Sequence, residues 1–222
     1  MISSKKITHI IYDMDGLLLD TEPFYTHVTQ LIVQQYGKDF NWTLKAQMMG
    51  KSPIESARLL VEELDLPITP EDYLAQRVAG LEGLFPRAKA LPGAMTLTQH
   101  LKKQGIPQAV ATSSSQKSFN MKTTHHKSWF GLFDCIIMGD NPEVKHSKPA
   151  PDIFLAAAQC LKAPPEHCLV FEDSPAGVEG ALAAGMSVVA VPDHCLDQTL
   201  VNQADQIING LDEFSPKDWG LP

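Results

Sequence analysis

The chain has 222 residues and a formal net charge of −8, with 44% hydrophobic and 20% charged residues. This length supports a sizeable core and one domain that carries a large insertion. The acidic balance argues against a nucleic-acid binder, whereas a small anionic substrate needs only a local positive site. No apolar run approaches the 18 residues of a membrane span, so we expect no membrane segment.

A short buried strand is expected at residues 7–12, before a long segment in which the spacing of apolar residues is different. From Thr21 to about Phe85, apolar residues recur at spacings of three and four. This spacing places them on one face of a helix, so the segment is predicted to be all helical. Asp20 and Glu22 stand where its first helix would begin, and we assign Asp20 and Thr21 to capping or to a hinge.

Beyond residue 91, predicted strands and helices alternate. The expected strands are 106–112, 134–139, 168–171, 187–191 and 206–208, and the expected helices are 94–104, 117–129, 152–161 and 175–184. This alternation predicts an α/β fold, with a Rossmann-like, doubly wound parallel sheet as its core. The helical segment interrupts that core as an inserted all-helical cap domain. The expected boundaries are 1–17 and 88–222 for the core and 18–87 for the cap.

Polar residues follow four of the predicted strands at their carboxyl ends. Ligands bind at this edge in open parallel sheets. These residues are Asp13 and Asp15 after the first strand, Thr112 to Ser115 after the second, Lys148 beyond the third, and Glu172, Asp173 and Ser174 after the fourth. Four separate segments therefore deliver acids, hydroxyls and one lysine to one edge, which indicates a functional site more strongly than any single motif.

The residue types at this edge fit a magnesium ion and a phosphate group. Gathered carboxylates repel one another unless a cation lies between them, and oxygen ligands without histidine or cysteine suit Mg²⁺. Thr112, nearby backbone amides and Lys148 offer donors and positive charge to a phosphate. Each has an ordinary alternative: Asp13 could form a turn, Lys148 could be a solvated lysine, and the Glu172–Asp173 pair could cap a helix.

Four motifs in the chain resemble those of a known superfamily in order, spacing and context. The motifs are DMDGLLLD at 13–20, ATSSS at 111–115, HSKPAPD at 146–152 and FEDSPAGVEGALAAG at 171–185. They resemble the haloacid-dehalogenase superfamily of phosphohydrolases, and the helical segment resembles its α-helical cap of the first type, C1. Segments 49–51, 119–127, 139–156 and 220–222 resemble, more narrowly, the pseudouridine-5′-phosphatases of that superfamily.

The resemblance implies catalytic roles for two aspartates. Asp13 would be the nucleophile that forms an aspartyl-phosphate, and Asp15 would protonate the leaving alcohol and then take a proton from the attacking water. A carboxylate is a weak nucleophile, so neutralising the phosphoryl charge is what makes its attack effective. Because Asp15 must begin protonated, we expect closure of the cap to desolvate it and raise its pKa.

The resemblance also implies the residues that bind phosphate and metal. The Thr112 hydroxyl and the Ser113 amide would bind the phosphoryl group, and Lys148 would hold its oxygens close to the nucleophile. Asp173, with Glu172 nearby, would complete a Mg²⁺ site together with the nucleophilic aspartate Asp13 and the backbone carbonyl of Asp15.

The cap is expected to choose the substrate. Gly50 and Lys51 lie in a loop between cap helices, and we expect Lys51 to contact the leaving group, although a solvated lysine at a helix start is the alternative. The implied reaction is Mg²⁺-dependent hydrolysis of a small phosphorylated metabolite, such as the nucleoside monophosphate pseudouridine 5′-phosphate. A sugar phosphate is the alternative substrate. The expected protein is a monomer or weak dimer with no nucleic-acid or membrane partner.

Two other activities are weighed against this hypothesis. Related phosphosugar mutases, of the β-phosphoglucomutase type, carry a cap histidine about twelve residues after the nucleophile, where this chain has Tyr25. A phenol cannot shuttle a proton at neutral pH, which favours hydrolysis. Receiver domains place their aspartate after the third strand and are about half this length, so that class is disfavoured by fold-level analogy.

The chain has four widely spaced cysteines and no CxxC pair. The cysteine pattern therefore predicts neither a zinc site nor a redox motif. The cysteines are Cys135, Cys160, Cys168 and Cys195. We interpret them as reduced thiols in a cytoplasmic protein.

Overall fold

The structure is a computed structural model that describes residues 6–48 and 52–222. Among these residues, six strands form one sheet in the order β5-β4-β1-β6-β7-β8, and every neighbouring pair is parallel. The strands are β1 (His9–Tyr12), β4 (Gln108–Thr112), β5 (Cys135–Met138), β6 (Cys168–Glu172), β7 (Ser187–Ala190) and β8 (Gln206–Ile207). The α/β, Rossmann-like parallel sheet expected from the alternating pattern is confirmed.

Helices cover both faces of this sheet because successive strand side chains point to opposite sides. Ile10 and Tyr12 face one apolar cluster, whereas Ile11 faces the other. Three helices contribute to the first cluster: α5 (Ala94–Lys103), α6 (Gln116–Lys122) and α7 (Lys127–Phe130). Two helices contribute to the second: α8 (Asp152–Leu161) and α9 (Pro175–Ala183). The sheet is therefore buried on both sides, which explains its nearly continuous apolar strands.

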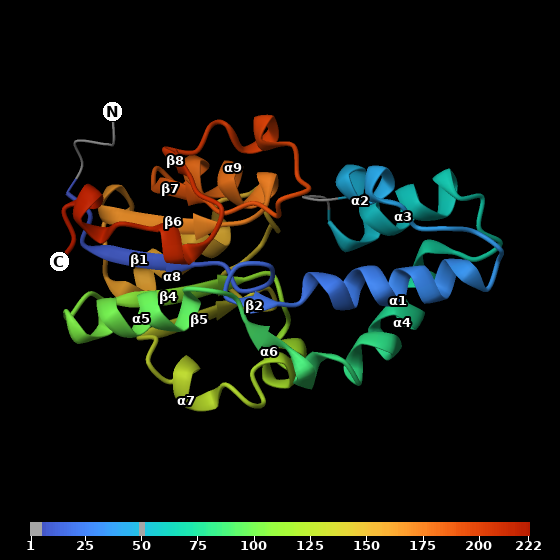
Figure 1. Cartoon of the computed structure of the whole chain (residues 1–222), viewed down its shortest axis with the longest axis horizontal. Coiled ribbons are helices and arrows are strands. Elements are labelled where there is room, and N and C mark those ends of the chain that lie inside the picture. Colours follow the sequence, from blue (N-terminus) through green and yellow to red (C-terminus); the bar gives the residue numbers. More distant parts are fainter. Residues whose placement is uncertain (1–5, 49–51) are drawn as a thin grey trace.

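Four helices between β2 and β3 form a group beside the sheet (Figure 1). We call them the helical block: α1 (Glu22–Gln34), α2 (Trp42–Met48), α3 (Pro53–Glu63) and α4 (Pro70–Glu82). The block has its own apolar cluster, to which α1, α3 and α4 all contribute. Capping boxes at Ser52–Glu55 and Thr69–Asp72 begin α3 and α4. No helix in the described ranges is long and apolar enough to cross a membrane.

The two connections between sheet and block pair with each other. The strands β2 (Leu19–Asp20) and β3 (Lys89–Ala90) are antiparallel, with Leu19 opposite Ala90 and Asp20 opposite Lys89. The sequence analysis did not predict them, because strands of two residues show no period. Asp20 thus lies in the outgoing connection, where the hinge was expected.

The prediction of one continuous helix at residues 117–129 is wrong, because the helix is interrupted in its middle. Helix α6 ends at Lys122, turns occupy residues 123–126, and the short α7 follows. The hydroxyl of Thr123 donates to the Phe119 carbonyl, and that of Thr124 donates to the carbonyls of Asn120 and Met121. Threonine side chains that bond to nearby carbonyls compete with a continuing helix, and this competition accounts for the interruption.

The expectation of four reduced thiols is wrong for two of them. Cys135 at the start of β5 and Cys160 near the end of α8 form a disulfide, while Cys168 and Cys195 are free. Their separation of 25 residues carries no motif signal. The fold brings them together because α8 packs across β5.

Removing this disulfide is expected to lower the free energy of unfolding by about 3 kcal/mol, because the cross-link restricts a long loop in the unfolded chain. The double variant Cys135→Ala and Cys160→Ala, measured by urea denaturation, tests this. Cys195→Ala, which removes an exposed free thiol, is the matched control and should leave the midpoint unchanged. An identical midpoint for all three proteins would contradict the expectation.

Candidate active site

The site lies where three adjacent strands end. Strand β1 lies between β4 and β6, so the loops that follow these strands meet at one edge. Asp13 and Asp15 follow β1, Thr112 ends β4, and Glu172 ends β6 with Asp173 directly after it. The Asp13 amide bonds to the Phe171 carbonyl, which continues the β1–β6 pairing into the site.

Lys148 joins two of these carboxylates. Its Nζ lies 2.5 Å from Asp13 Oδ1 and 2.6 Å from Glu172 Oε1, and it also donates to the Ala111 carbonyl at 3.2 Å. Burial raises the pKa of Asp13 to about 7, although Lys148 opposes the rise. Burial alone would lower the pKa of Lys148, but the two carboxylates outweigh it and raise that pKa. Lys148 is therefore a fixed cation between two buried acids.

Glu172 uses both of its oxygens within the protein. Its Oε2 accepts from the backbone amides of Asp173 and Ser174 at 3.0 and 3.1 Å, and from the Ser174 hydroxyl at 3.1 Å. A Cβ on Gly177 would lie 1.8 Å from Glu172 Cδ, so the first turn of α9 has room for this carboxylate only because residue 177 is glycine. These contacts make Glu172 a support of Lys148 and of the loop after β6. Its place in the expected Mg²⁺ site stays a prediction.

Asp173 has a different environment. No hydrogen bond or ion pair within residues 6–48 and 52–222 involves its carboxylate. Burial raises its pKa well above the ordinary value, and the charges of Glu172, Asp13 and Glu22 add to the rise. Gly16 has φ +79°, and a Cβ there would lie 2.2 Å from Asp173 Oδ2. The turn after β1 thus needs glycine both for its backbone and for this close approach.

Asp15 is held by a cation that the sequence analysis missed. Lys122 Nζ lies 2.6 Å from Asp15 Oδ1. Thr21 donates to the same oxygen at 2.7 Å, and Ser114 donates to Oδ2 at 2.8 Å. Burial would raise the pKa of Asp15, but Lys122 and these hydrogen bonds outweigh it and lower the pKa. This direction is opposite to the expected rise, because that expectation did not include Lys122.

Lys122 is fully buried on α6, in the core, and touches the helical block. Its Nζ also donates to the Tyr25 hydroxyl at 2.8 Å and to Ser114 Oγ at 2.6 Å. The rings of Tyr25 and Phe85 lie 5.3 and 4.5 Å from Nζ. One signal could have found it: Lys122 lies three residues after the buried Phe119, on the apolar face of its helix.

The remaining phosphate-binding candidates lie in the loop after β4. Thr112 is buried, accepts from the Ser114 amide at 3.1 Å and lies 3.5 Å from Asp15 Oδ2. The side chain of Ser113 is exposed. The backbone of Ser113 passes so close to Gly139 that a Cβ on residue 139 would lie 2.4 Å from the Ser113 carbonyl oxygen. The two cap candidates, Gly50 and Lys51, lie outside the described residues.

Two clefts open beside these residues. The larger, about 570 Å³, lies between the strand ends and the helical block, and Asp15, Ser113 and Lys148 line it. The smaller, about 410 Å³, includes Gly16 and Asp173 and reaches the loop after β7. There Trp42 of α2 donates from Nε1 to the Cys195 carbonyl at 2.9 Å, so the block touches the core on this side as well.

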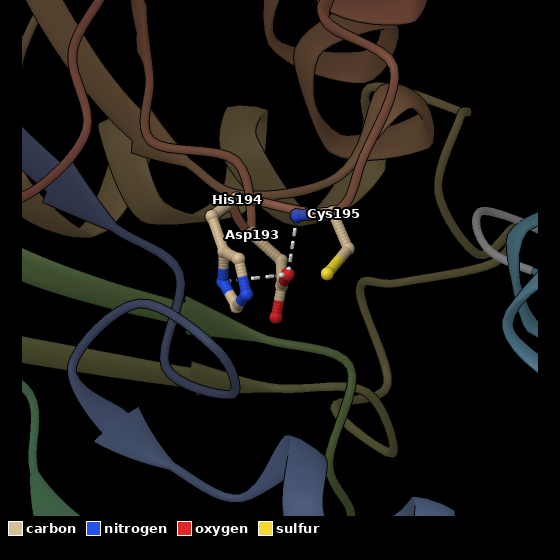
Figure 2. A group of neighbouring side chains, drawn as sticks. All are labelled: Asp193, His194 and Cys195. Atoms are coloured by element: carbon tan, nitrogen blue, oxygen red, sulfur yellow. Dashed lines mark hydrogen bonds and ion pairs between the residues drawn. The ribbon is translucent and has the colours of Figure 1, made fainter.

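Figure 2 shows Asp193, His194 and Cys195, three consecutive residues of that loop. Within the described part of the chain, they are the one group of three histidine, cysteine, aspartate or glutamate residues whose possible metal-ligating atoms all lie within 4.8 Å of one another. Asp193 Oδ1 accepts from the Cys195 amide at 2.8 Å and lies 3.3 Å from Nδ1 of His194, whose side chain is 90% exposed. These contacts are made within an exposed loop, so we assign no metal to the group.

The sequence from residue 7 to residue 185 matches the family description of haloacid dehalogenase-like hydrolases. The chain belongs to this family. A haloacid dehalogenase hydrolase of family IA, variant 3, from Entamoeba histolytica has the same fold, with a TM-score of 0.81 at 23% identity over 96% of this chain and 97% of that one.

Named relatives of the chain are phosphatases. Two (DL)-glycerol-3-phosphatases of Arabidopsis thaliana are each 48% identical over 221 residues, which cover 97% of this chain and 74% and 92% of those proteins. A Drosophila melanogaster protein named "Probable pseudouridine-5′-phosphatase" is 44% identical, over 98% of this chain and 96% of that protein. This haloacid dehalogenase-like hydrolase is thus a phosphoric monoester hydrolase that acts on small phosphorylated metabolites.

Replacing Lys122 by methionine is expected to lower the free energy of unfolding by about 3–5 kcal/mol, because the buried Asp15 carboxylate would lose its cation. Urea denaturation measures the change. Lys117→Met on the same helix is the control: its Nζ pairs with Glu82 at the surface, with 71% of the lysine side chain exposed. That change should cost less than about 1 kcal/mol. Equal small losses for both variants would contradict a stabilising role for the buried pair.

Proposed function

We propose that the protein is a Mg²⁺-dependent phosphomonoesterase that acts through an aspartyl-phosphate, with a nucleoside monophosphate such as pseudouridine 5′-phosphate as its substrate. The observation that carries this proposal is the Asp13–Lys148 pair, 2.5 Å apart beside a cleft of about 570 Å³. A carboxylate held by a fixed cation at the end of a buried strand offers both a nucleophile and compensation for phosphoryl charge.

Asp13 would attack phosphorus, and the leaving alcohol would depart on the opposite side. Lys148 keeps the carboxylate in one orientation and offsets the negative charge that the phosphoryl oxygens bring to it. Glu172 holds Lys148 in place through a second ion pair. Thr112, buried at the end of β4, would supply a hydroxyl to the transferred group. Preorganised donors of this kind act without reorganising at the moment of reaction.

Asp15 would serve as acid in the first half-reaction and as base in the second. Its lowered pKa keeps Asp15 ionised, which is the form that can accept a proton from the water that hydrolyses the aspartyl-phosphate. To protonate the leaving alcohol it must first bind a proton. The negative charge of an arriving phosphate favours that step, because like charges raise the pKa of a carboxylate.

The acids around Asp173 fit a divalent cation. Asp13 and Asp173 are buried carboxylates with raised pKa values, and Asp173 has no ion-pair partner among the residues described. Oxygen donors of this kind suit Mg²⁺, which would be held by these two carboxylates and the Asp15 carbonyl. When bound, Mg²⁺ supplies positive charge that neutralises the phosphoryl group.

The helical block would be the cap, at residues 18–87 between core segments 1–17 and 88–222. A cleft of about 570 Å³ between block and strand ends is within the range of small-molecule pockets and favours a nucleoside over glycerol as the leaving group. Glycerol 3-phosphate is the second candidate substrate, because relatives named for it are 48% identical to the chain.

Hydrolysis is favoured over mutase transfer by the environment of Tyr25. Burial raises the pKa of this phenol to about 12, and the charge of Asp15 adds to the rise. A group with this pKa holds its proton throughout the neutral range, so it cannot act as the histidine of the phosphosugar mutases does.

Phosphate release from pseudouridine 5′-phosphate, uridine 5′-phosphate and glycerol 3-phosphate tests the proposed function, with and without EDTA. Asp13→Asn is expected to lower kcat by at least about 10³-fold, because it removes the nucleophile. Asp39→Asn, at an exposed position in the block, is the matched control and should keep full activity. Normal turnover by Asp13→Asn, or no release from any substrate by folded wild-type protein, would overturn the proposal.

Mg²⁺ is expected to raise the melting temperature of the wild-type protein, since a ligand that binds the folded state stabilises it by mass action. Asp173→Asn should melt at a higher temperature than wild type without metal, because it replaces a buried acid whose ionisation is disfavoured with a neutral amide, and should gain less from Mg²⁺. Calorimetry across a Mg²⁺ series measures both effects. Equal gains for the two proteins would contradict a role of Asp173 in metal binding.

A further inference from the structure

A guanidinium without an acidic partner lies in the wall of the larger cleft. Arg77, on α4, lines this cleft, and no hydrogen bond or ion pair of the described residues includes it. Its Nε is buried and has no acceptor among the described residues. A buried donor without an acceptor costs free energy, and one in a native structure indicates a further partner such as water, an ion or a ligand.

The other cations that line this cleft among the described residues, Lys45, Lys117 and Lys148, are each paired with a carboxylate. Lys45 lies 3.1 Å from Glu22 Oε2, and Lys117 lies 2.5 Å from Glu82 Oε1. Within each of these two pairs, the positive charge of the lysine is offset by a carboxylate that also lines the cleft. Arg77 therefore adds a positive charge, available to whatever occupies the space between block and strand ends.

Tyr25 fixes the place of this guanidinium. The Cζ atom of Arg77 lies 4.6 Å from the centre of the Tyr25 ring, and the hydroxyl of that ring bonds to Lys122, the partner of Asp15. One aromatic ring and one lysine thus separate Arg77 from the proposed acid and base. The ring occupies a face of the guanidinium and leaves its terminal N–H groups free to bind in the plane.

We propose that Arg77 determines specificity by binding a planar oxygen acceptor on the leaving group. The acceptor is a carbonyl of a pyrimidine-dione ring or a carboxylate, since both present oxygens in one plane, as the guanidinium fork requires. The apolar side chains of Leu81 and Phe85 line the same cleft and suit the flat body of such a group. This inference rests on the proposed phosphatase function and names the part of the substrate that the helical block reads.

Two matched pairs of substrates isolate this contact. Pseudouridine 5′-phosphate differs from ribose 5-phosphate by the pyrimidine-dione, and 3-phosphoglycerate differs from glycerol 3-phosphate by a carboxylate in place of a hydroxymethyl group. Arg77→Met should lower kcat/KM by about 10- to 100-fold for the acceptor-bearing member of one pair, the loss expected for one charged hydrogen bond. The pair that responds identifies the acceptor.

The remaining substrates should change by less than about threefold, on the same scale of interaction energies. They include phenyl phosphate, whose leaving group has no acceptor besides its ester oxygen. Arg58→Met, in the same block but exposed on α3 and outside the cleft, is the matched control and should change none of the values. Arg77→Lys keeps the charge without the planar fork, so it should resemble Arg77→Met. Melting temperatures show whether each variant is folded.

The outcomes separate this inference from the proposed function. An equal loss on all substrates, no loss on any, or full activity of Arg77→Lys would overturn the role of Arg77 while phenyl phosphate turnover upholds the phosphatase. If folded wild-type protein hydrolyses none of the five substrates, the proposed function fails and the inference fails with it. A selective loss in one pair supports both.

Discussion

Buried carboxylates at the ends of neighbouring parallel strands are the constraint on which the site depends. Charges of one sign gathered in a place of low dielectric repel one another strongly. The chain offsets them with two buried lysines from separate segments: Lys148 joins Asp13 to Glu172, and Lys122 joins Asp15 to the rest of its hydrogen-bond network. Among the described residues Asp173 pairs with neither lysine, which supports the proposed metal ion at this corner of the site.

This division of the lysines separates two aspartates that are neighbours in sequence. Burial raises the pKa of Asp13 to about 7, whereas the contacts of Asp15 lower its pKa. Environments that push pKa values apart are how one site assigns different tasks to the same residue type. The partner of Asp15 also contacts Tyr25, so the helical block contributes directly to the surroundings of one aspartate.

Much of the fold was predictable because its signals are local. Alternating strands and helices predicted the parallel sheet, and the motifs after β1, β4 and β6 predicted which residues meet at its edge. What was missed depends on contacts between distant segments. Lys122 looks like a surface lysine in a short helix until the fold places Asp15 and Tyr25 against it. The Cys135–Cys160 disulfide follows from the packing of α8 on β5, and it removes the cysteine argument for a reducing compartment.

The pairing of β2 with β3 has a consequence for how the cleft opens. The chain passes between sheet and block twice, and the two passages are hydrogen-bonded to each other, with Leu19 opposite Ala90. The block is therefore a closed loop anchored at one ribbon, and a loop with joined ends samples far fewer arrangements than a segment on two independent tethers. The ribbon therefore restricts the arrangements open to the block, whose residues Tyr25 and Arg77 line the cleft beside the strand ends.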